Sequence, residues 1–115
     1  MNILTTAQHA VLDIVTVIVF ALAPVVLGLE GTAATIAYIL AAVHLLMTLL
    51  TAGLPGVPGR LVPLPLHGLV EASVGVVLGL VGWLAFDGTA GAFYLVMAAV
   101  ILLVFAITPY TKVAI

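Results

Sequence analysis

The sequence contains no cysteine and very few charged residues. The absence of cysteine excludes disulfide bonds, thiolate metal ligands and thiol catalysis. Only 5% of the residues are charged, and Lys and Arg together number 2, whereas soluble proteins carry about 25% charged residues. So few basic residues cannot form a phosphate-binding patch, and we therefore expect no nucleic acid among the partners. Hydrophobic residues make up 66% of the chain, which excludes intrinsic disorder and indicates an integral membrane protein.

Four long apolar stretches account for this composition. They cover about residues 6–29, 33–52, 65–86 and 90–108. Each is close to the ~20 residues that a helix needs to cross ~30 Å of hydrocarbon, and none alternates in polarity as a membrane strand does. The sequence therefore predicts an all-α membrane protein. We expect residues 1–115 to form a single four-transmembrane-helix bundle, with the lipid bilayer as its main partner.

Local signals agree with these helix boundaries. Thr5 and Gln8 have the spacing of a capping box at the first helix. Thr32 and Thr89, which each follow a glycine, are the expected N-caps of the second and fourth helices. Pro65 is expected in the first turn of the third helix. The segment 53–64 is rich in proline and predicts a stiff linker.

The orientation in the membrane depends on very few residues. An N-terminal signal peptide is one interpretation of the first stretch, because Ala21-Leu22-Ala23 has the small residues of a cleavage site. No Lys or Arg precedes this stretch and Asp13 interrupts it, so we expect the helix to be retained. Four spans place both termini on one side, together with Arg60 and Lys112. The positive-inside rule then predicts that both termini are cytoplasmic.

The chain also repeats itself. Glu30-Gly31-Thr32-Ala33 matches Asp87-Gly88-Thr89-Ala90, and Thr51 aligns with Thr108 in the same register. With one residue of slippage, His9-x-x-x-Asp13 aligns with His67-x-x-x-Glu71. The sequence thus predicts two parallel helical-hairpin repeats, at about 6–52 and 65–109, related by a pseudo-twofold axis along the membrane normal.

The duplicated hairpin resembles the SPW-repeat family, a two-helix membrane repeat with a Ser-Pro-Trp signature near the end of its first helix. Ala23-Pro24-Val25 is similar to a degenerate copy of that signature, and Val81-Gly82-Trp83 is similar to its partner. Pro24 stands in one copy, Trp83 in the other, and the serine in neither. The resemblance implies a small integral protein of a prokaryotic inner membrane. The family has no established activity, so the resemblance implies no function.

Five ionisable residues lie within or at the edges of the expected spans: His9, Asp13, His44, His67 and Glu71. At 1.5 Å per residue, Asp13, His44 and Glu71 lie about 9–12 Å from the same membrane face. A carboxylate in hydrocarbon costs about 2.5–3.5 kcal/mol, so both acids are expected to face the bundle interior. We expect His44 to lie between them as their partner. His9 and His67 each lie four residues before one of these acids, on the same helical face, and each taken alone is expected to snorkel to the interface.

These residues leave several functions open. Three imidazoles and two carboxylates suffice for a Zn, Fe, Mn or Cu site if the ring nitrogens converge. Two opposed histidines could instead ligate haem, and the group could relay a proton or hold a small ligand. The alternative is a structural or accessory membrane subunit, in which the polar groups only stabilise helix packing at about 0.6 kcal/mol per hydrogen bond. A classical enzyme is not expected, because the sequence has no nucleophile elbow, phosphate loop or dinucleotide motif.

Glycines and aromatic residues in the expected spans indicate how the helices pack and where they meet the lipid headgroups. Gly75-x-x-x-Gly79, continued by Gly82, is a close-packing motif of membrane helices. We expect it to serve packing inside the bundle, with a homo-oligomer through the Gly75/Gly79 face as the alternative. Aromatic residues near the outer membrane face are expected at headgroup level: Tyr38, Trp83 and Tyr94.

Overall fold

The computed structural model describes residues 5–52 and 61–108. Within these ranges the chain forms four α-helices and no strand. The helices are α1 (Thr6–Val26), α2 (Gly31–Ala52), α3 (Leu64–Leu84) and α4 (Gly88–Ile107). Each is long and apolar enough to cross a membrane. The expected all-α fold with four candidate membrane spans is therefore confirmed.

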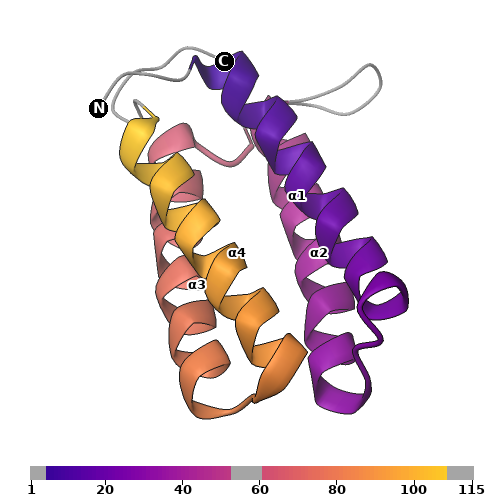
Figure 1. Cartoon of the computed structure of the whole chain (residues 1–115). Helices are drawn as coiled ribbons and strands as arrows, with labels where there is room; N and C mark the ends of the chain where they lie inside the picture. Colours follow the sequence, from indigo (N-terminus) through magenta and orange to yellow (C-terminus); the bar gives the residue numbers. More distant parts are fainter. Residues whose placement is uncertain (1–4, 53–60, 109–115) are drawn as a thin grey trace.

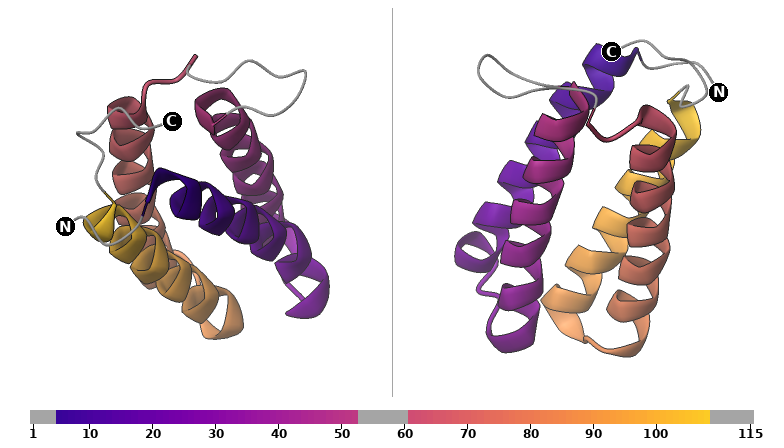
Figure 2. Two further views of the ribbon diagram at one scale, coloured as in Figure 1. Left: turned by 90° about the horizontal axis from the view of Figure 1, so that it is seen from above. Right: turned by 180° about the vertical axis from the view of Figure 1, so that it is seen from behind.

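The helices are arranged as two hairpins (Figure 1). Helix α1 packs along α2, and α3 packs along α4, whereas contacts between the two hairpins are much sparser. Helices α1 and α3 start at the same end of the molecule, and the two short interhelical turns lie at the other end (Figure 1). Viewed from above, α1 points toward the second hairpin at its N-terminal end (Figure 2). That the hairpins arise from an internal repeat stays a prediction.

The start of α1 follows the predicted capping box. The Thr5 hydroxyl accepts a hydrogen bond from the Gln8 amide at 3.1 Å, and the Gln8 side chain accepts one from the Thr5 amide at 2.9 Å. Two backbone donors that the helix cannot pair are satisfied in this way. Helix α3 also begins as expected, with Pro65 in its first turn after an N-cap at Pro63.

The predicted N-caps of α2 and α4 are wrong. Helix α2 already includes Gly31, and the N-cap of α4 is Asp87, so Thr32 and Thr89 lie inside the first turns. The reason is the backbone of the preceding glycines. Gly31 and Gly88 have φ values of 55° and 59°, a left-handed conformation that glycine adopts without steric cost. The chain turns at the glycine, and each helix begins two residues earlier than a threonine cap would require.

Several sequence predictions fall outside the described residues. They concern Arg60, Lys112, the prolines between 53 and 60, and Pro109. The cytoplasmic placement of the termini depends on the two basic residues and therefore stays a prediction.

The glycines of α3 allow close packing against α4. A Cβ atom added at Gly75 would lie 2.7 Å from the Leu102 side chain, and one at Gly82 would lie 3.0 Å from the Leu95 amide nitrogen. Gly79 faces α4 as well, with a built Cβ only in ordinary contact. This face of α3 is thus covered by α4 within the chain, and a homo-oligomer stays a prediction.

The aromatic residues near the turns divide into two groups. Trp83 and Tyr38 are 74% and 48% exposed, so they lie on the outside of the bundle as interface residues do. Tyr94 is fully buried, and its expected place in an interfacial belt is wrong. Its hydroxyl donates to the Ala33 carbonyl of α2 and so links the two hairpins. Pro24, one half of the degenerate motif, is buried in the last turn of α1.

Candidate metal centre

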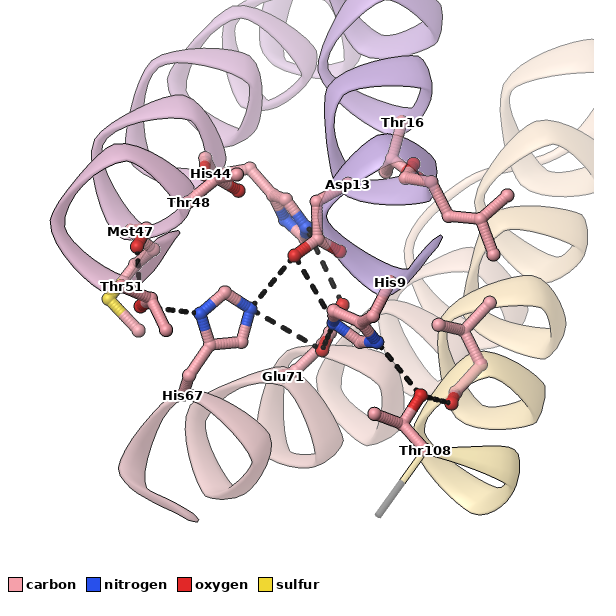
Figure 3. A network of polar contacts seen from close by, with 12 residues as sticks. His9, Asp13, Thr16, His44, Met47, Thr48, Thr51, His67, Glu71 and Thr108 are labelled. Carbon is pink, nitrogen blue, oxygen red and sulfur yellow. Dashed lines mark hydrogen bonds and ion pairs between the residues drawn. The ribbon is translucent and has the colours of Figure 1, made fainter. Parts of the chain in front are cut away.

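The five ionisable residues of the spans form one buried cluster, which we call the His/acid cluster: His9, Asp13, His44, His67 and Glu71 (Figure 3). Their side chains come from α1, α2 and α3. Each residue is at most 8% exposed. The predicted convergence of three helices on one level is confirmed.

The prediction that His9 and His67 snorkel to the interface is wrong. They are 2% and 3% exposed. Because each ring finds polar partners on both of its nitrogens inside the bundle, neither needs to reach the headgroups for hydrogen bonds.

Four of the side chains converge most closely. The Nε2 atom of His9 lies 3.1 Å from Asp13 Oδ2 and 3.0 Å from Glu71 Oε2. The Nε2 atom of His67 lies 3.0 Å from Asp13 Oδ2 and 3.6 Å from Glu71 Oε2. All four donor atoms fall within 4.8 Å of one another. The contacts His9–Glu71 and His67–Asp13 also join the two hairpins, which otherwise touch sparsely.

His44 lies between the two acids, as predicted. Its Nε2 atom faces the other oxygen of each acid, at 3.4 Å from Asp13 Oδ1 and 3.6 Å from Glu71 Oε1. It contacts both carboxylates, but His9 and His67 contact them as well, so three imidazoles rather than one surround the pair. The shortest contacts of His9 and His67, 3.0 Å each, are made to the acid of the other hairpin. His44 reaches the pair from α2.

Two threonines hold the rings of His9 and His67. The Nδ1 atom of His9 lies 2.8 Å from Thr108 Oγ1, and that of His67 lies 2.8 Å from Thr51 Oγ1. Each threonine hydroxyl donates its proton to the carbonyl four residues earlier, at 2.6 Å for Thr108 and 2.7 Å for Thr51. A hydroxyl has a single proton, so each must accept from the ring. Both histidines therefore carry a proton on Nδ1 and turn Nε2 toward the carboxylates.

The sequence interpretation missed these two threonines as partners of the histidines. The signal that could have found them is the repeat itself, since Thr51 and Thr108 align and follow the two aligned His-x-x-x-acid pairs. In the structure the pairing crosses between hairpins: His9 of α1 meets Thr108 after α4, and His67 of α3 meets Thr51 of α2.

The cluster needs positive charge between its nitrogen and oxygen atoms. A neutral imidazole with its proton on Nδ1 would point the Nε2 lone pair at a carboxylate oxygen. Among the described residues, Asp13 Oδ2 has no hydrogen-bond partner, although two Nε2 atoms lie 3.0 and 3.1 Å away. Two protons, one on each ring, or one divalent cation would compensate the two carboxylates, whose burial is otherwise costly.

No family model, curated protein or solved structure matches the chain, so its function is inferred from the His/acid cluster, and membership of the SPW-repeat family stays a prediction.

Proposed function

We propose that this membrane protein binds a divalent transition-metal ion inside the bundle, with His9, Asp13, His67 and Glu71 as ligands. The observation that carries the proposal is the convergence of four buried donor atoms within 4.8 Å. Metal–ligand bonds of about 2.0–2.1 Å in a tetrahedron separate neighbouring ligand atoms by about 3.3–3.4 Å. The four distances between the histidine Nε2 atoms and the carboxylate oxygens, from 3.0 to 3.6 Å, lie around that value.

The surroundings of the ligands support the same proposal. A histidine that ligates a metal through one nitrogen usually donates the other N–H to a fixed acceptor, and Thr108 and Thr51 provide that acceptor. One divalent ion with two carboxylates is neutral, which lowers the cost of burying the charges in a membrane. The mixed nitrogen and oxygen donors suit Zn²⁺, Fe²⁺ or Mn²⁺. His44 supports the site from the far side of the carboxylates.

Haem does not fit this arrangement. The rings of His9 and His67 are 5.5 Å apart at their centroids and inclined by 78°. Oxygens of Asp13 and Glu71 lie 3.0–3.6 Å from the same Nε2 atoms, where a macrocycle between two axial histidines would have to pass. We therefore propose a metal ion alone.

A second candidate function is a structural or accessory membrane subunit whose His/acid cluster only holds the bundle together. The observation in its favour is that the cluster bridges hairpins that otherwise touch sparsely. In this case two imidazolium ions balance the two carboxylates, and no metal is needed.

Metal analysis separates the two functions. The protein is purified in detergent, stripped with a chelator and titrated with Co²⁺, whose visible absorption is intense in a tetrahedral site. We expect stoichiometric binding that Zn²⁺ displaces and that is lost in Asp13→Asn and His67→Gln. Thr48→Val is the matched control, because Thr48 is buried on α2 and its hydroxyl bonds, among the residues that the structure describes, only to the His44 carbonyl. If the folded protein binds neither Co²⁺ nor Zn²⁺, the metal-binding function is excluded and the structural function is supported.

A further inference from the structure

The four proposed metal ligands lie near one end of the bundle. His9 and His67 are the fourth residues of α1 and α3, and Asp13 and Glu71 are the eighth residues of these 21-residue helices. At 1.5 Å per residue, each histidine lies about 5 Å from the start of its helix, whereas about 20 Å of helix follows each acid. We call the end at which α1 and α3 begin the ligand end, and the opposite end, with the two short interhelical turns, the turn end (Figure 1).

Apolar side chains fill the interior between the acids and the turn end. Phe20, Leu78 and Tyr94 are each at most 3% exposed there, and the rings of Phe20 and Phe93 pack edge to face at 5.8 Å. The Tyr94 hydroxyl already donates to the Ala33 carbonyl. A divalent ion that moved through this region would exchange charged ligands for hydrocarbon, in which charge is strongly disfavoured.

The groove between the two hairpins is apolar as well. It lies between α2 and α3 and is lined by aliphatic side chains, among them Leu40, Val74 and Val77, together with Ser73. The Ser73 hydroxyl donates to the Leu69 carbonyl of its own helix. Transition-metal ions bind nitrogen, oxygen and sulfur donors, so this groove does not provide the successive ligands that a path for the ion would need.

The ligand end, in contrast, has polar groups next to the metal ligands. The Nδ1 atoms of His9 and His67 contact the hydroxyls of Thr108 and Thr51, which lie at the ends of α4 and α2 (Figure 3). Only about one turn of α1 and of α3 precedes the two histidines. An ion that arrives from water at this end therefore crosses a layer about 5 Å deep, in which hydroxyl and imidazole groups are available as ligands.

We propose that the metal ion enters and leaves the bundle only at the ligand end, so that the protein exchanges the ion with one aqueous compartment and does not carry it across the membrane. This inference rests on the proposed metal site. It makes the protein a receptor or store for metal ions of that compartment rather than a transporter. With both termini cytoplasmic, as the basic residues predict, the compartment is the cytoplasm.

The test selects the orientation of the full chain in vesicles. The natural sequence has no cysteine, so one introduced cysteine provides a unique label. Glu30 is exposed in the turn between α1 and α2, and Leu61 is exposed just before α3, at the ligand end. Glu30→Cys and Leu61→Cys are each loaded with radiolabelled Zn²⁺, reconstituted at fewer than one chain per phosphatidylcholine vesicle on average, and labelled with a membrane-impermeant biotin maleimide. Streptavidin then retains vesicles with the turn end outward for Glu30→Cys and with the ligand end outward for Leu61→Cys.

EDTA is then added outside the retained vesicles. We expect it to remove Zn²⁺ from the vesicles captured through Leu61→Cys, and to leave Zn²⁺ in those captured through Glu30→Cys until detergent is added. In detergent, EDTA should remove the ion equally from both variants. Loss of Zn²⁺ from both sets of vesicles, from neither set, or from the Glu30→Cys set alone would overturn this inference while leaving the metal site itself intact. A chain that binds no Zn²⁺ in detergent would refute the proposed function, and this inference with it.

Passage across the membrane is measured separately. Vesicles that contain the natural sequence and a trapped Zn²⁺-sensitive dye are exposed to Zn²⁺ from outside. We expect the dye signal to match that of protein-free vesicles. A faster signal that is lost in Asp13→Asn would overturn the inference, because the ion would then cross the bundle through the metal site.

Discussion

Replacing Thr51 by valine tests whether the threonine hydroxyls orient the histidines for a metal ion. Valine has nearly the same shape, so the change removes only the hydroxyl, which accepts from His67 Nδ1 at 2.8 Å and donates to the Met47 carbonyl. The N–H of that buried ring loses its partner, which costs about 1–3 kcal/mol. Loss of such a partner of a ligating histidine typically lowers metal affinity by about 10–100-fold, equivalent to about 1.4–2.8 kcal/mol. The two estimates agree, so we expect a 10–100-fold weaker affinity for Zn²⁺.

Thr48→Val is the control for this experiment. Thr48 and Thr51 lie on the same helix, are each 3% exposed, and each donate to a carbonyl four residues earlier. Only Thr51 also accepts from a histidine ring. The ratio of the two Zn²⁺ affinities, measured by competition against Co²⁺, therefore isolates the His67 contact. Equal affinities in the two variants would refute the orienting role, whereas Thr108→Val should resemble Thr51→Val.

Three further outcomes are expected. Gly82→Ala should destabilise the bundle by about 1–3 kcal/mol, because the new Cβ would lie 3.0 and 3.1 Å from backbone atoms. Gly79→Ala should leave the stability nearly unchanged, because its new Cβ would lie 3.6 Å from the nearest atom, an ordinary contact distance. Unfolding in detergent and denaturant compares these two variants, and equal stabilities would contradict the packing analysis. Tyr94→Phe removes the bond to the Ala33 carbonyl, and we expect a loss of about 0.6 kcal/mol, seen as a lower Tm; an unchanged Tm would contradict it. Zn²⁺ affinity should fall steadily from pH 7.5 to pH 5, because protons compete for the imidazole and carboxylate ligands; an affinity independent of pH would argue against histidine ligation.

Much of the candidate site was predictable because the sequence spacing of two residues in a helix determines whether their side chains share a face. The i, i+4 spacing of His9 and Asp13, and of His67 and Glu71, places each pair on one helical face. The cost of a carboxylate in lipid turns both faces inward. Depth along a helix follows from 1.5 Å per residue, so the common level of Asp13, His44 and Glu71 followed as well.

The partners across the cluster were not predictable in the same way. Whether Asp13 meets His44 or His67 depends on how α1, α2 and α3 cross, and spacing along one helix carries no information about a neighbouring helix. The contacts of His9 with Glu71 and of His67 with Asp13 were not predicted for this reason, and Thr51 and Thr108 were missed as partners. Tyr94 was likewise placed at the interface from its depth alone, whereas its direction around α4 turns it toward α2.

The amino-acid order by itself determined the membrane class, the number of helices and the burial of the two acids, because these follow from local hydrophobicity, helix geometry and the energetic cost of charge in hydrocarbon. Only the tertiary structure decided which nitrogen faces which oxygen, which hydroxyl holds each ring, and that apolar side chains from all four helices fill the interior beyond the acids. Those features depend on side chains that are distant in sequence, and their positions are set by packing between helices rather than within one.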